Sequence, residues 1–154
     1  MLMPDLIPRA KALGVVVVQN PAHFMLRDDV VARLGPERVK FVQPMKSLLA
    51  AGVPIALGSD GPLNPFLNIL FATTHAVNPS EALTREEAVT AYTAGAAFAE
   101  FKEQEKGRLV VGSLADLAVL SADLFTAPAP QLPAITSVMT MIGGRIVHDS
   151  GAVR

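Results

Sequence analysis

The stretch Gly52-Val53-Pro54-Ile55-Ala56-Leu57-Gly58-Ser59-Asp60-Gly61-Pro62 decides the fold. Residues 53–57 form an apolar run without polar alternation, which is typical of a strand that helices cover on both faces of a parallel sheet. The run ends in glycine, serine, aspartate and proline, which are turn-forming residues. The stretch therefore predicts a buried strand that delivers Ser59 and Asp60 to the carboxyl edge of a sheet.

A second apolar run, Val15–Val18, has the same character, and we expect it to form another strand buried on both faces. Residues 19–29 then form a predicted polar loop. Helices are predicted around these strands over residues 4–13, 44–51 and about 66–76, the first two ending at Gly14 and Gly52. Helices that alternate with buried strands indicate βα units on a parallel sheet, which is an α/β fold.

The character of the chain changes near residue 106. Before it, Thr84 and Glu87 form a capping box that opens a helix through Tyr92, and Gly95 is predicted to mark a turn into a second helix near residues 96–102. After it, short strands are predicted over residues 107–109, 114–120 and 137–148, with a hairpin at Gly143-Gly144 and a proline-rich connector over 127–133. We therefore predict two domains, residues 1–105 and residues 106–154.

Composition excludes several classes of protein. Thirteen Lys and Arg against 14 Asp and Glu give a net charge of -1 without a basic stripe, so we expect no nucleic-acid partner. No apolar run approaches the roughly 20 residues that span a bilayer, and the first residues do not resemble a secretory signal. Cysteine is absent, which fits a reducing compartment and predicts a cytoplasmic protein. The chain is 51% hydrophobic and only 18% charged, against about 25% charged in typical domains, so part of its surface is expected to be covered.

Ligands of parallel α/β folds bind at the carboxyl ends of the strands, where this sequence places Asp60, Ser59 and His23. Asp60 could bind a hard cation or accept a proton from water, or it could simply stabilise an Asx turn. His23 could ligate a metal, polarise a carbonyl or act as an acid or base, or be a surface residue. His75 and His148 are expected to be structural. One carboxylate and one imidazole fall short of the three protein ligands usual at a metal site.

Four stretches taken in order, residues 52–62, 83–97, 106–120 and 138–147, resemble the C-terminal part of the amidohydrolase superfamily. The branch they resemble includes N-substituted formamide deformylases. The resemblance implies the last two βα units of a TIM-type (β/α)8 barrel, followed by the C-terminal strands of a small β-sandwich domain. It also implies that Asp60 is both a metal ligand and the catalytic proton carrier, and that His23 and Ser59 bind substrate.

The activity implied by this resemblance is hydrolysis of a carbon–nitrogen bond in a small non-peptide amide by a metal-activated water. The cofactor would be a divalent metal, with zinc favoured and iron or manganese possible. The HxH, Lys or Glu, and further His ligands of the family do not occur in these 154 residues. The metal is therefore expected only if a partner, either a missing N-terminal half or a second copy, supplies those ligands.

Two hypotheses follow. The chain is either the C-terminal portion of an enzyme or a truncated, non-catalytic assembly or binding module, including a gene remnant. An in-frame sequence encoding HxH upstream of the Met1 codon would favour the enzyme, and a nearby stop codon would favour the remnant. Both hypotheses predict that the isolated chain is poorly soluble or oligomeric, because strands with unpaired edges and apolar faces favour association.

Overall fold

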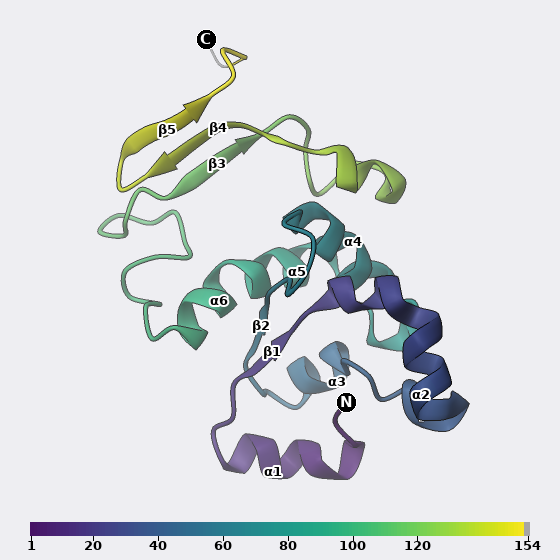
Figure 1. Cartoon of the computed structure of the whole chain (residues 1–154). Coiled ribbons are helices and arrows are strands. Elements are labelled where there is room, and N and C mark those ends of the chain that lie inside the picture. Colours follow the sequence, from purple (N-terminus) through teal and green to yellow (C-terminus); the bar gives the residue numbers. More distant parts are fainter. Residues whose placement is uncertain (153–154) are drawn as a thin grey trace.

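The computed structural model describes residues 1–152, and two short parallel strands lie at the centre of its first half (Figure 1). Strand β1 (Val17–Gln19) pairs with β2 (Ile55–Leu57) in a parallel register that aligns Val17 with Ile55. All three residues of β2 are buried, as predicted. The strand predicted at Val15–Val18 forms over Val17–Gln19, but its predicted burial on both faces is wrong, because Val18 is 57% exposed. Within the described residues β1 pairs along one edge only, with β2, so its other edge has no strand partner and the side chain of Val18 stays exposed.

Helices surround the strand pair on its amino-terminal side. The first predicted helix is a 3-10 turn η1 (Pro4–Leu6) that runs into α1 (Ile7–Ala12), and Gly14 follows with a φ of +65°. The predicted helix before β2 is α3 (Met45–Ala50).

The predicted loop over residues 19–29 is wrong. A 3-10 helix η2 (Pro21–Leu26) follows β1 and continues directly into α2 (Arg27–Val39). Gly35, with φ 75° and ψ 165°, breaks α2 just before Pro36, so this segment consists of two short helical pieces across a kink. Neither piece presents a long apolar stripe to the core, and this explains why the sequence pattern reads as polar loop.

Four further helical segments follow β2 in the chain: α4 (Pro65–Thr74), η3 (Pro79–Glu81), α5 (Arg85–Tyr92) and α6 (Ala94–Ala99). Of these, α5 and α6 pack against β2. The capping box is confirmed, since the Glu87 amide donates to the Thr84 hydroxyl and the Thr84 amide donates to the Glu87 carboxylate. Gly95 does not form the predicted turn but lies inside α6, where a Cβ atom would overlap the carbonyl oxygen of Ile55. This glycine is required because α6 packs directly against the backbone of β2.

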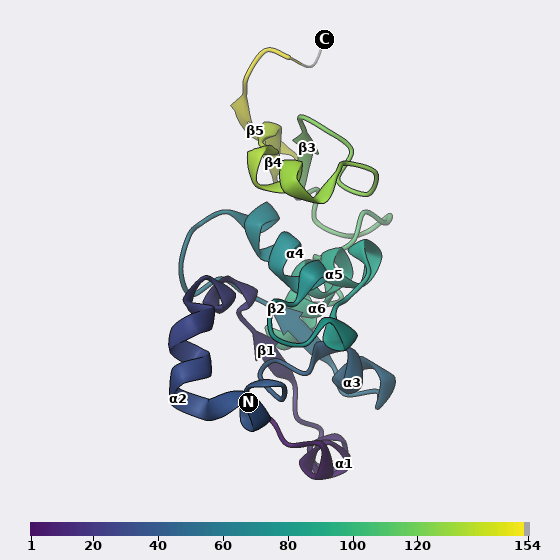
Figure 2. The ribbon, with the colours of Figure 1, turned by 90° about the vertical axis from the view of Figure 1, so that its right-hand side faces the viewer.

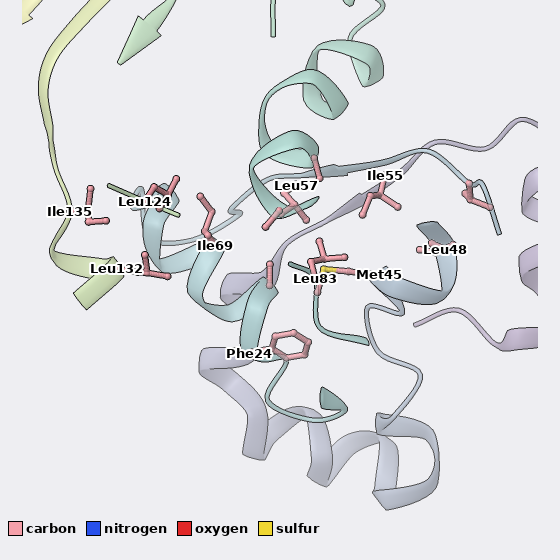
Figure 3. Packing of buried hydrophobic residues seen from close by; sticks show 14 of the residues in the cluster. Phe24, Met45, Leu48, Ile55, Leu57, Ile69, Leu83, Leu124, Leu132 and Ile135 are labelled. Carbon is pink, nitrogen blue, oxygen red and sulfur yellow. The ribbon is translucent and has the colours of Figure 1, made fainter. Parts of the chain in front are cut away.

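One hydrophobic core joins these elements (Figure 3). Met45 and Leu48 of α3 are completely buried, and so is Leu132 of the 3-10 helix η4 (Ala129–Ala134). The predicted proline-rich connector therefore contributes a core residue through η4. Leu124 and Ile135 belong to the same cluster, so residues on both sides of position 105 share one core.

The last part of the chain is a three-stranded antiparallel sheet of β3 (Leu117–Leu120), β4 (Ser137–Ile142) and β5 (Arg145–Asp149), in that order. Both views show it at one end of the molecule, beyond α4 and α5 (Figures 1 and 2). The predicted hairpin is confirmed, with positive φ angles of 57° and 78° at Gly143 and Gly144. The strand predicted over 107–109 is absent from the described residues, and that predicted over 114–120 begins only at Leu117. No helix in residues 1–152 combines the length and apolar character needed to cross a membrane.

Candidate functional site

The carboxyl ends of β1 and β2 lie side by side and form the candidate site. The amide of Gly58, just after β2, donates to the carbonyl oxygen of Gln19 at the end of β1 over 2.9 Å. The two chains that leave the strands therefore start from one edge of the sheet. The first carries His23 and the second carries Ser59 and Asp60, as the sequence predicts for a parallel pair.

His23 and Asp60 meet across this edge. The Nε2 atom of His23 lies 3.2 Å from the Oδ2 atom of Asp60, and the two side chains are 45% and 74% exposed. A carboxylate only accepts hydrogen bonds, so the imidazole donates through an N–H at Nε2. The expectation that both residues face the same mouth is confirmed. Asp60 has a φ of 44°, a left-handed conformation that aspartate tolerates better than most residues.

Ser59 lies on the same turn as Asp60 and is partly buried. The turn rests on η2, because a Cβ atom at Gly61 would lie 3.8 Å from Cβ of Ala22 and 3.6 Å from the Ser59 carbonyl oxygen. Within residues 1–152 the hydroxyl of Ser59 makes no hydrogen bond. Ser59 lies beside Asp60, and its role in substrate binding stays a prediction.

Buried residues of α4 fix the backbone on both sides of His23. The Ala22 amide donates to Oδ1 of Asn68 over 2.9 Å, and Asn68 is completely buried. The ring of Phe24 packs against that of His75 at the end of α4, with centroids 4.6 Å apart. Sequence reasoning missed Asn68, which lies 46 positions from its partner and belongs to a mainly apolar helix.

His75 and Gln43 form a second buried support. The Asn78 amide donates to Nδ1 of His75 over 3.1 Å, so Nδ1 is an acceptor and the ring proton is on Nε2, which donates to the carbonyl oxygen of Gln43. The Gln43 side chain in turn donates from Nε2 to the carbonyl oxygen of Asn20 over 2.9 Å. His75 thus has the structural role expected of it, and it supports the loop that carries His23.

Asp60 is the carboxylate of this site that could contribute to a divalent metal centre. It is exposed, its side-chain partner among residues 1–152 is His23, and it presents the oxygen donor that hard cations bind. In residues 1–152 no three His, Asp or Glu side chains gather as a metal-binding group. A single carboxylate fits as a contributor to a site whose other ligands come from outside this set of residues.

The strand pair and its polar carboxyl edge place the chain among parallel α/β proteins with a strand-end site. The model of the amidohydrolase family (Amidohydro_3) matches residues 1–148. The chain therefore belongs to the amidohydrolase family.

Similar proteins agree with this assignment. A Bacillus subtilis (strain 168) protein named as an amidohydrolase, YtcJ, is 35% identical over 94% of this chain and 30% of its own length. The N-substituted formamide deformylase of Arthrobacter pascens is 27% identical over 92% of this chain and 28% of its own length. An uncharacterized metal-dependent hydrolase from Pyrococcus horikoshii OT3 superimposes with a TM-score of 0.74 and 26% identity, over 84% of this chain and 29% of that one. The chain thus spans about 30% of the length of the curated relatives it matches.

Proposed function

We propose that this chain is the C-terminal share of a metal-dependent amidohydrolase that hydrolyses a carbon–nitrogen bond in a small non-peptide amide. The observation that carries the proposal is the Asp60–His23 pair, whose atoms lie 3.2 Å apart at the shared carboxyl edge of two parallel strands. The names of the relatives support it, since one is a formamide deformylase and another a metal-dependent hydrolase.

The architecture we propose is the last two βα units of a TIM-type (β/α)8 barrel over residues 1–105, and the C-terminal strands of a small β-sandwich over residues 106–154. The parallel pairing of β1 with β2, with α4 following the second strand, supports the barrel portion. The antiparallel order β3-β4-β5 supports the sandwich portion. In such a barrel further strands would pair with this sheet and cover the exposed side of β1.

Asp60 is the residue that would hold a divalent metal, zinc in the first place and iron or manganese as alternatives. Such a metal, when bound, lowers the pKa of a coordinated water toward neutrality. The remaining ligands would come from the rest of the barrel. The exposure of the Asp60 carboxylate supports this role, because an oxygen already enclosed by hydrogen-bond donors could not bind a cation.

Asp60 would also move the proton. Its carboxylate accepts the proton that the attacking water loses while the carbon–oxygen bond forms, and then delivers it to the nitrogen as the carbon–nitrogen bond breaks. The products are a carboxylic acid and an amine. His23 holds the carboxylate in place through Nε2 and faces the substrate together with Ser59.

The substitution Asp60→Asn in the protein with its complete ligand set tests this function. We expect a loss of turnover of at least about a hundredfold, since an amide cannot accept the proton. The free energy of unfolding should change by less than about 0.5 kcal/mol, because the side chain is 74% exposed. Asp28→Asn on α2, 94% exposed, is the matched control and should leave both quantities unchanged. Near-normal turnover of Asp60→Asn would remove Asp60 from the mechanism.

A non-catalytic assembly module is the second candidate function. The observation that favours it is the exposed face of β1, where Val18 is 57% exposed, together with the absence of a three-ligand metal group in residues 1–152. It predicts that the purified chain self-associates in sedimentation experiments and binds no zinc tightly. Stoichiometric metal binding together with amide hydrolysis by the purified 154-residue chain would contradict it.

A further inference from the structure

Asn20 follows β1 directly, and its side-chain carboxamide forms no hydrogen bond with any of the residues that the structure describes. It occupies the position before η2, where an asparagine side chain usually accepts from the amides two or three residues further on. No such bond forms here. Within residues 1–152 neither the oxygen nor the nitrogen of this carboxamide has a hydrogen-bond partner.

The backbone explains why the side chain does not cap the helix. Pro21 has no N–H to offer. The Ala22 amide is taken by Oδ1 of Asn68 over 2.9 Å, and the His23 amide by the carbonyl oxygen of Asn20 itself over 3.0 Å. Every nearby donor is thus absent or occupied, so the carboxamide of Asn20 is left free for another partner.

The free carboxamide lies against Gly58, at the carboxyl end of β2. A Cβ atom placed on Gly58 would be only 2.9 Å from Oδ1 of Asn20, so the side chain extends across the residue that precedes Ser59 and Asp60. The backbone beneath it is held by Gln43, whose Nε2 donates to the Asn20 carbonyl oxygen over 2.9 Å. The backbone of Asn20 is therefore held at the strand-end edge that also carries His23 and Asp60, and the glycine makes room for its side chain.

We propose that Asn20 is a specificity-determining residue whose carboxamide pairs with the donor–acceptor edge of an amide substrate. An asparagine presents an N–H donor and a carbonyl acceptor on one edge, which matches an amide that presents both groups on its own edge. An ester of the same shape offers acceptors only, so it can accept from the N–H of the asparagine but cannot donate to its carbonyl oxygen. This inference rests on the proposed function, because it assigns the substrate class of the same site.

Two probes of equal shape test the pairing. 2-Pyrrolidone holds an N–H and a carbonyl on one edge of a ring, and γ-butyrolactone replaces that N–H by oxygen. The full 154-residue chain, labelled with 15N, is titrated with each probe while the side-chain NH2 signals of Asn20 are followed by NMR. We expect the lactam to shift these signals and to bind about five- to tenfold more tightly than the lactone, as for loss of one hydrogen bond.

Three variants complete the experiment. Asn20→Leu removes both hydrogen bonds and should bind the lactam more weakly than the parent chain binds the lactone, by about five- to tenfold for each bond lost. Gly58→Ala should weaken it similarly, because the new Cβ displaces the carboxamide. Gln104→Leu is the matched control, since its carboxamide is exposed in the turn that follows α6, and it should bind as the parent does. Amide spectra establish that each variant is folded.

Equal shifts with lactam and lactone, or unchanged lactam binding by a folded Asn20→Leu chain, would overturn the proposal. The outcome is separable from the proposed function, because probe binding requires no turnover. If Asp60→Asn keeps its activity while Asn20 still discriminates the probes, the catalytic assignment fails and the recognition by Asn20 stands. If Asp60→Asn is inactive and Asn20 does not discriminate, the recognition fails alone.

Discussion

Replacement of Gly95 by alanine should loosen the contact between α6 and β2, the strand that ends at Asp60. A Cβ atom at Gly95 would overlap the carbonyl oxygen of Ile55 and lie 3.4 Å from that of Thr90. Both neighbours are backbone atoms, which cannot rotate away as a side chain could. The methyl group therefore has to push α6 off the strand.

The magnitude follows from two opposing effects. Overpacking of this kind costs about 3 kcal/mol at the upper end of its usual range. Alanine inside a helix gains about 1 kcal/mol over glycine. The net loss in the free energy of unfolding is thus about 2 kcal/mol, which lowers the urea midpoint by about 1 M at an m-value of about 2 kcal/mol per molar.

Urea unfolding followed by far-ultraviolet circular dichroism measures the effect of Gly95→Ala. Ala96→Gly in the same helix is the control, and it should lose only the helix-propensity difference of about 1 kcal/mol. Propensity alone would make Gly95→Ala more stable than the parent chain. A midpoint equal to or above that of the parent would therefore refute the close-packing explanation of Gly95.

Two further predictions concern stability. Leu132→Ala removes a completely buried side chain and should lower the free energy of unfolding, measured with urea, by about 2–5 kcal/mol. Leu63→Ala, at a 95% exposed position, should change it by less than about 0.5 kcal/mol, and equal effects of the two substitutions would contradict the assigned core. The hydrogen bond from Lys46 lowers the pKa of Glu87 below its ordinary value of 4.5. The ionised carboxylate therefore stabilises the fold above pH 4.5, and this stabilisation is lost as the pH falls through the lowered pKa. Lys46→Met should thus lower the urea midpoint near neutral pH, and the gap to the parent chain should close as the pH falls below the lowered pKa of Glu87. A gap that does not depend on pH would count against this pair.

The sequence predicts those features that depend on neighbouring residues. The capping box at Thr84, the glycine turn after α1 and the Gly143-Gly144 hairpin each follow from local conformational preferences, and all three occur in the structure. The meeting of His23 and Asp60 was also predictable, because the carboxyl ends of adjacent parallel strands share one edge.

The features that sequence reasoning missed depend on partners far along the chain. The supports of the His23 loop come from Asn68 and Gln43, which are 46 and 23 positions from the backbone groups they bind. Gly95 reads locally as a turn residue, and only the approach of α6 to β2 reveals why it is needed. Asn20 left no local signal either, because Asn64 is also followed by proline and its side chain does cap α4 by accepting from the Leu67 amide.

The excess of apolar residues is not confined to the core. Val18 on β1 is 57% exposed, Leu109 and Val111 before β3 are 73% and 107% exposed, and Ile146 on β5 is 51% exposed. These side chains lie on the open strands and in the segment leading into the small sheet, whereas the polar residues of the site occupy the edge beyond the strand ends. Under the enzyme proposal, further strands of the barrel and sandwich would cover them, and under the assembly proposal a second copy would do so. In both cases the apolar surface governs association and the strand-end edge with Asp60 governs chemistry. Substitutions on the apolar surface should therefore leave the chemistry unchanged, and substitutions at Asp60 should leave association unchanged.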